Sequence, residues 1–174
     1  MATTTVNKIQ LRIQNKRTQG FDQGSRVLTS NLESDLTWAN GSGTSEADEV
    51  WTDNITLGIG LFNNLDLNAL AQTDALGAAD RTVDFVNIKA MMIRNTSAAD
   101  YILVGGGTDC AGAADAWSGV DTPFSTDAAI TTVPAGGVFT WVAPIGGAVA
   151  AGEILGIGAV TSIQTFQILL IGDK

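Results

Sequence analysis

The sequence has 174 residues and a formal net charge of −9. A chain of this length buries enough surface to fold as one domain without disulfides or a bound metal, and its one cysteine, Cys110, excludes an intramolecular disulfide. It contains no histidine, which removes Ser-His and Cys-His nucleophiles and leaves no residues for a Cys/His zinc site.

The first segment, residues 1–30, is basic and is expected to form an N-terminal arm. Within it, apolar and polar residues alternate from residue 8 to residue 14, which predicts a strand with one buried face. The chain beyond residue 31 carries thirteen more acidic than basic residues. The arm can therefore dock on the acidic surface of a like neighbour, although a basic strand face that meets only water fits the same pattern. The candidate interface residues are Lys8, Arg12, Lys16 and Arg17.

Residues 31–49 are rich in Ser, Thr, Asn, Gly and acidic residues, which predicts a long polar loop between the arm and the body. The body, residues 50–174, consists of short apolar runs separated by Gly-rich turns. Runs of this length and spacing are typical of β-sandwiches and related folds. We therefore predict an all-β fold, an antiparallel β-sandwich of jelly-roll-like form with an extended N-terminal arm. The expected strands lie in 50–57, 65–70, 83–93, 101–104, 130–133, 138–142, 154–160 and 166–171.

Some stretches of the body leave a local choice. Residues 68–76 and 111–117 each come shortly before a glycine and fit either a short helix or an Ala-rich loop. In the run 83–93 the apolar phase changes near residues 85–86, which predicts a β-bulge there. The last run, 164–171, alternates at first and then becomes apolar on both faces. We expect its second half to be covered on two sides, either as a central strand or by another subunit.

No motif in the sequence points to catalysis. The glycine pairs lack the third glycine of a dinucleotide-binding loop, and the chain has no Gly-Lys-Ser/Thr to cradle a phosphate. A carboxylate pair could act on a glycosidic bond, but solvated loop carboxylates are the commoner interpretation, so we assign no catalytic residue. Residues 64–68 lack the Gly and Glu of an EF-hand loop, and we expect no metal and no cofactor. The carboxylate pairs considered are Asp48 with Glu49, Asp80 with Asp84, and Asp109 with Asp115.

Four tryptophans could offer a stacking surface to a sugar. Trp51 and Trp141 lie within apolar runs and are expected in the core. Trp38 and Trp117 have polar or small neighbours and are the candidate surface aromatics. A carbohydrate-binding or adhesin module is therefore the alternative function. The acidic body disfavours nucleic acid and anionic membranes as partners.

A set of short motifs in the body resembles small structural proteins of tailed bacteriophages that are encoded near the head genes. The likeness covers roughly residues 50–174 and has no single diagnostic signature. It is carried by VWTDN at 50–54, LDL at 65–67, VNIKAMMIRN at 86–95, VPAGGVF at 133–139, AP at 143–144 and ILLIG at 168–172.

The resemblance implies a virion component with a jelly-roll-like sandwich, a capsid decoration or cement protein or part of a head fibre. Its partners would be copies of itself, in a homotrimer, and the major capsid protein or another virion protein. The sequence start lacks the charged and apolar regions of a signal peptide, which agrees with assembly in the host cytoplasm. The resemblance assigns no site residue.

Overall fold

Twelve strands and no helix are present in the part of the chain that the structure describes. This computed structural model describes residues 7–21, 24–43, 46–73, 79–105, 117–118, 122–124, 126 and 129–174. The strands are β1 (Asn7–Phe21), β2 (Gly24–Trp38), β3 (Glu49–Leu57), β4 (Leu61–Asp66), β5 (Leu70–Thr73), β6 (Ala79–Val83), β7 (Asn87–Asn95), β8 (Tyr101–Gly105), β9 (Ile130–Pro134), β10 (Val138–Ala148), β11 (Ile154–Ala159) and β12 (Gln164–Asp173).

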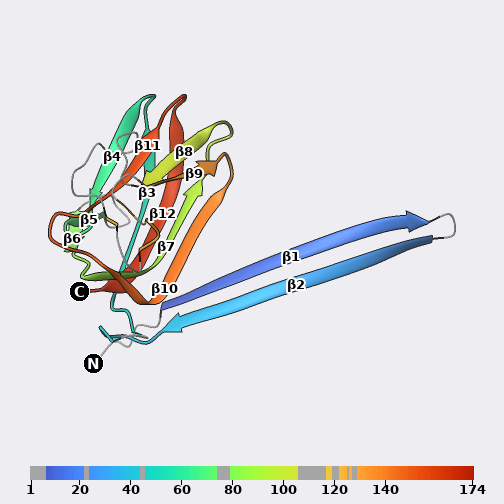
Figure 1. Cartoon of the computed structure of the whole chain (residues 1–174), viewed down its shortest axis with the longest axis horizontal. Coiled ribbons are helices and arrows are strands. Elements are labelled where there is room, and N and C mark those ends of the chain that lie inside the picture. The colour runs from blue at the N-terminus through green and yellow to red at the C-terminus, as the bar shows by residue number, and fades with distance from the viewer. Residues whose placement is uncertain are drawn as a thin grey trace.

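Two four-stranded antiparallel sheets pack face to face and form the body (Figure 1). One sheet has the order β10-β7-β12-β3, and the other has the order β4-β11-β8-β9. Strands β5 and β6 pair as a separate small hairpin. The predicted all-β antiparallel sandwich is confirmed. Its inner faces are apolar because alternate residues of each strand point into the same layer.

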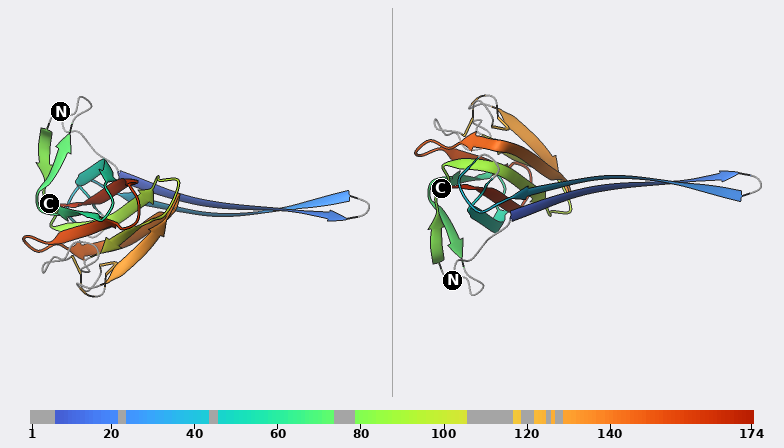
Figure 2. Two further views of the ribbon diagram at one scale, coloured as in Figure 1. Left: turned by 90° about the horizontal axis from the view of Figure 1, so that it is seen from above. Right: turned by 90° about the horizontal axis from the view of Figure 1, so that it is seen from below.

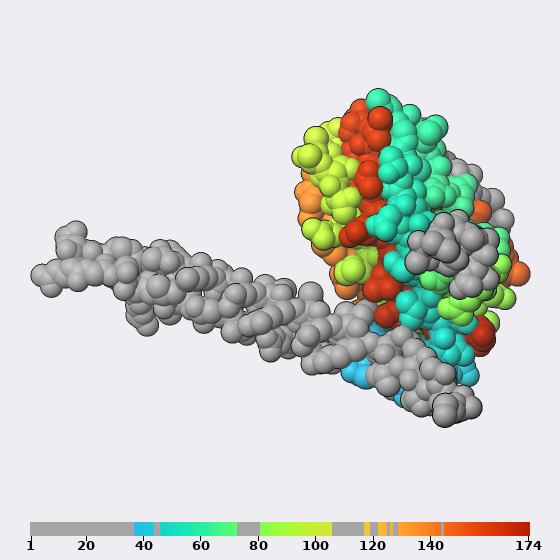
Figure 3. Space-filling model, turned by 180° about the vertical axis from the view of Figure 1, so that it is seen from behind, coloured from blue at the N-terminus to red at the C-terminus, as the bar shows by residue number. Residues whose placement is uncertain are grey.

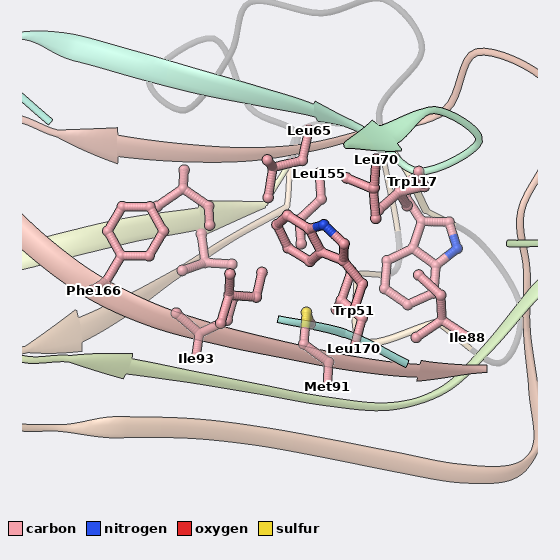
Figure 4. Packing of buried hydrophobic residues seen from close by; sticks show 14 of the residues in the cluster. Trp51, Leu65, Leu70, Ile88, Met91, Ile93, Trp117, Leu155, Phe166 and Leu170 are labelled. Atoms are coloured by element: carbon pink, nitrogen blue, oxygen red, sulfur yellow. The ribbon is translucent and has the colours of Figure 1, made fainter. Parts of the chain in front are cut away.

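The core lies between the two sheets (Figure 4). Trp51 from β3 and Leu170 from β12 pack there with Leu155 from β11. Trp51 also donates an indole hydrogen bond of 2.9 Å to the carbonyl of Ala71, so its polar atom is satisfied inside the core. Trp51 is almost fully buried, as predicted, whereas Trp141 is only partly buried and packs against the same cluster.

The change of apolar phase after residue 83 is a strand break, so the predicted bulge at 85–86 is wrong. Val83 ends β6 and Phe85 is buried in the core, while Val86 is exposed before β7 begins. A bulge does occur further along β7, where the pairing with β12 shifts between Ala90 and Ile88 and leaves Lys89 as the extra residue. Strand β12 is central, between β7 and β3, which is one of the two arrangements expected from the sequence.

Strands β1 and β2 form a long antiparallel hairpin that extends away from the sandwich (Figures 1 and 2). Each strand has 15 residues, which corresponds to about 50 Å at the usual rise of ~3.3 Å per residue. The polar segment predicted as a loop over 31–49 differs in the structure, because β2 continues to Trp38 and the loop begins at Ala39. The sequence did not reveal this end of β2, because three consecutive polar residues separate Leu32 from Leu36 and no strict alternation is visible. Residues 70–73 form β5, and the other candidate helix lies mostly outside the described residues.

Candidate interaction surfaces

Trp38 holds the base of the hairpin against the outer face of the β10-β7-β12-β3 sheet. It is only 2% exposed and packs with Ala47, Ala90 and Ile171. Partly buried residues of the same face surround this cluster: Val50, Val142 and Leu169. Trp38 was predicted to be a surface aromatic, and this is wrong, because the sheet beneath it presents apolar residues on its outer face. The outer face of β12 near Ile171 is therefore covered by Trp38 and Ala47 of the same chain.

Trp117, the other candidate surface aromatic, is also buried. It is 1% exposed and meets Trp141 in a T-shaped contact with ring centroids 5.4 Å apart. Its indole nitrogen donates a 2.9 Å hydrogen bond to the carbonyl of Ala148, and its backbone nitrogen donates to Ile154. Trp117 was predicted to be a surface aromatic, and this is wrong, because its ring packs in the core with Trp141 and Phe124.

A buried ion pair fixes the segment that joins the hairpin to the body. Lys89 Nζ lies 2.7 Å from a carboxylate oxygen of Asp173, and both side chains are almost inaccessible. Lys89 also donates hydrogen bonds to the backbone carbonyls of Gly43 and Glu46. Asn87 donates a 2.8 Å hydrogen bond to the other oxygen of Asp173. The lysine therefore ties the loop before β3 to two strands of the sheet.

Glu49 is the other buried carboxylate at this end of the body, and it bridges two cations. Its oxygens lie 2.9 Å from Arg81 and 2.9 Å from the Lys174 amine. The hydrogen bond and the charge of Glu49 raise the pKa of Lys174 above its ordinary value. Asp48 accepts the backbone N–H of Lys174 at 3.2 Å. Glu49 is thus engaged in ion pairs with Arg81 and Lys174.

The other two carboxylate pairs considered in the sequence lie partly or wholly outside the described residues. Asp84 accepts a hydrogen bond from the Asn68 amide, while Asp109, Asp115 and the side chain of Asp80 lie outside the described set. Asp66 accepts the backbone N–H of Asn68, so these residues close a turn after β4. No group of three metal-ligating side chains occurs among the residues with described positions.

An apolar patch occupies the end of the body that is far from the hairpin base. Its turns, 58–60 and 160–163, lie side by side, because Gln164 pairs with Leu57 and Ala159 pairs with Leu61 (Figure 3). The described part of the chain has nine exposed large hydrophobic residues, and five of them lie in these short turns or directly beside them. We call this surface the apex patch: Ile59, Leu61, Phe62, Tyr101, Leu103, Val160 and Ile163.

The apex patch contains an open hollow of about 290 Å³ on the outer face of the β4-β11-β8-β9 sheet. Phe62 of β4 and Leu103 of β8 lie on its two sides, because both pair with Gly158 of the strand between them, β11. Tyr101, Val160 and Gly60 complete its lining: all five lining residues are Gly60, Phe62, Tyr101, Leu103 and Val160. No charged side chain lines it, so it favours an apolar occupant.

The two strands of the hairpin pair along their whole length. Near the body, Ile9 lies opposite Leu36 and Ile13 opposite Leu32. Further from the body, Asn15 lies opposite Ser30. The predicted interface residues Lys8, Arg12, Lys16 and Arg17 all lie on β1, and their side chains are outside the described set.

The comparisons with known proteins identify no relative of this chain. No family model matches it, and neither a curated protein nor a solved structure does so. Within the residues whose positions are described, no helix has the length and apolar character needed to cross a membrane.

Proposed function

We propose that the protein is a non-catalytic structural component of a bacteriophage virion, a capsid decoration or cement protein that associates with its own copies and with the capsid lattice. The observation that carries the proposal is the long hairpin, which extends from the sandwich instead of packing on it. An isolated two-stranded hairpin is at best marginally stable in water. A projecting hairpin of this length is therefore suited to ordering against a neighbouring subunit.

Charge supports the same role. The hairpin carries five basic and three acidic residues, whereas the rest of the chain carries four basic and fifteen acidic residues. Opposite charges on two parts of one subunit favour contacts between copies and steer their encounter. The resemblance of residues 50–174 to phage head proteins supports the choice of the virion as the place of assembly.

The carbohydrate-binding alternative has lost the residues on which it rested. Trp38 and Trp117 are each at most 2% exposed, and both make intramolecular contacts that fill their ring faces. The other two tryptophans belong to the core or pack against it. These are all four tryptophans of the sequence, so none is left for a stacking platform and we do not propose this function.

Density-gradient fractionation of cells that express the protein with its own phage genome tests the proposal. The protein should sediment with the assembled particles in many copies per particle, as quantified by mass spectrometry. A protein that remains in the slow fractions while full particles form would overturn the virion assignment. Substituting Lys8, Arg12, Lys16 and Arg17 with Gln should lower the particle-bound fraction and its salt dependence. The matched control replaces Gln10 and Gln14, which lie on the same strand β1, with Thr.

A further inference from the structure

We propose that Lys89 and Asp173 condense to an isopeptide bond, an amide between their side chains that cross-links β7 to β12. The bond joins Nζ of Lys89 to the carboxyl carbon of Asp173 and releases one water molecule. The ion pair between these two side chains is the arrangement from which the bond forms. The inference goes beyond the proposed function and does not depend on the virion assignment.

The backbone of β7 sends Lys89 out of the regular ladder. Ala90 and Ile88 pair with consecutive residues of β12, and the pairing with β10 is interrupted at the same place. Lys89 therefore has no paired residue in either neighbouring strand. A bulge of this kind re-aims the side chain of the extra residue, and bulges are common next to reactive sites.

Two glycines leave room for the contact. An added Cβ at Gly172, which precedes Asp173, would lie 2.1 Å from the carbonyl oxygen of Asn87. An added Cβ at Gly146, whose φ is 92°, would lie 3.2 Å from Cγ of Lys89. Glycine in a strand permits such a close approach of a neighbouring strand. The bulge and the two glycines together bring the lysine and the carboxyl group into contact.

The nitrogen of Lys89 has one direction left for the carboxyl group. It donates hydrogen bonds to the carbonyls of Gly43 and Glu46, and it lies 2.7 Å from Oδ2 of Asp173. Oδ2 is buried and accepts no hydrogen bond from the residues that the structure describes, so the contact is a close approach without hydrogen-bond geometry. Because the carboxyl carbon is one bond from Oδ2, it lies within about 4 Å of Nζ, close to the roughly 3–3.5 Å of a reactive approach.

The reaction needs no other reactant. One proton passes from the ammonium of Lys89 to Oδ2 of Asp173, which gives an amine and a carboxylic acid. Exclusion from water lowers the cost of this transfer, because buried charges have lost their hydration. Nζ then attacks the carboxyl carbon, and the negative charge moves to Oδ1. A second proton passes from Nζ to the hydroxyl at Oδ2, the bond from carbon to Oδ2 breaks, and water leaves.

Asn87 and the burial of the site favour the product. The amide of Asn87 donates a 2.8 Å hydrogen bond to Oδ1 of Asp173, the oxygen that becomes negative in the tetrahedral intermediate. The side chains of Lys89 and Asp173 are at most 2% exposed. Bulk water is therefore kept from the amide, which protects it from hydrolysis.

Mass spectrometry of the full, denatured chain tests the bond. Wild type should be lighter than its sequence mass by one water molecule, because unfolding removes an ion pair but keeps a covalent bond. Lys89→Arg keeps the positive charge without the reactive amine and should have its full sequence mass. Lys174→Arg, at the lysine that pairs with Glu49, is the matched control and should still lack one water. Asn87→Ala should lower the fraction of cross-linked chains, since Oδ1 loses its donor.

Protease digestion locates the bond. The wild-type digest should contain one branched peptide that joins Lys89 to Asp173. A wild-type chain with its full sequence mass overturns the proposal, and so does a loss of water confined to a linear peptide. Loss of ammonia instead of water would place the bond at an amide side chain such as Asn87, which also overturns it. The wild-type chain alone decides between these results, so they do not depend on the folding of any variant.

Discussion

Lys89 on β7 and Asp173 on β12 form an ion pair inside the protein, with Lys89 Nζ 2.7 Å from Asp173 Oδ2. The same lysine binds two carbonyls of the loop that follows the hairpin. Because the pair is excluded from water, its electrostatic attraction is only weakly screened, and its loss leaves a charge without a partner. Lys89 therefore both stabilises the sheet through Asp173 and holds the loop in place through its hydrogen bonds.

Replacing Lys89 with Met should lower the free energy of unfolding by about 3–5 kcal/mol, because the carboxylate of Asp173 then stays buried without its cation. Urea unfolding monitored by fluorescence measures the change. The double variant Lys89→Met with Asp173→Asn should recover part of the loss, since the neutral amide removes the unpaired charge. A single variant that loses less than about 1 kcal/mol would contradict a buried pair of this kind.

Replacing Trp38 with Ala should free the base of the hairpin while the sandwich remains folded. Loss of a buried tryptophan commonly costs about 3 kcal/mol or more, which corresponds to a roughly 100-fold loss of local amide protection. Hydrogen exchange should show this loss in residues 39–47 and little change in β8 and β11. Thr37→Ala, at the exposed neighbouring position, serves as the control and should exchange as wild type does.

The contact of Lys174 with Glu49 predicts a pH dependence in alkali. The folded state holds the pKa of Lys174 above 10.5, so its stabilising contribution is complete below pH 10.5 and is lost as the pH rises through the raised value. The free energy of unfolding should therefore fall more steeply with pH in this window for wild type than for Lys174→Met. Urea titrations at closely spaced pH values provide the comparison. If the free energy of unfolding fell equally steeply with pH in wild type and in Lys174→Met, Glu49 would not be raising the pKa of Lys174.

Replacing Gly105 with Ala should destabilise the protein far more than the same change at Gly136. Gly105 has a φ of 144°, and an added Cβ would lie 2.1 Å from the carbonyl oxygen of Ala129, so the backbone must move. We expect a cost of about 3 kcal/mol or more. Gly136 has a φ of 67° with no atom within 4 Å of an added Cβ, and its cost should be about 1 kcal/mol. Thermal unfolding of both variants tests the ranking.

The sequence alone determined the fold class and most strand positions, because these follow from local patterns. Ile9, Leu11 and Ile13 alternate with polar residues and lie on a strand, and the run 166–171 lies within the central strand β12. Gly-rich turns and two-residue periodicity depend only on neighbouring residues, so they can be recognised without a partner strand.

Tertiary structure decided which residues are covered and which are left exposed. Trp38 and Trp117 have polar or small sequence neighbours, yet strands distant in sequence enclose them. Lys89 meets Asp173 only because β7 and β12 are adjacent, and the hollow beside Gly158 exists only because β4 and β8 flank β11. Burial and charge pairing depend on contacts between distant segments, and a local pattern carries no information about which segments will meet.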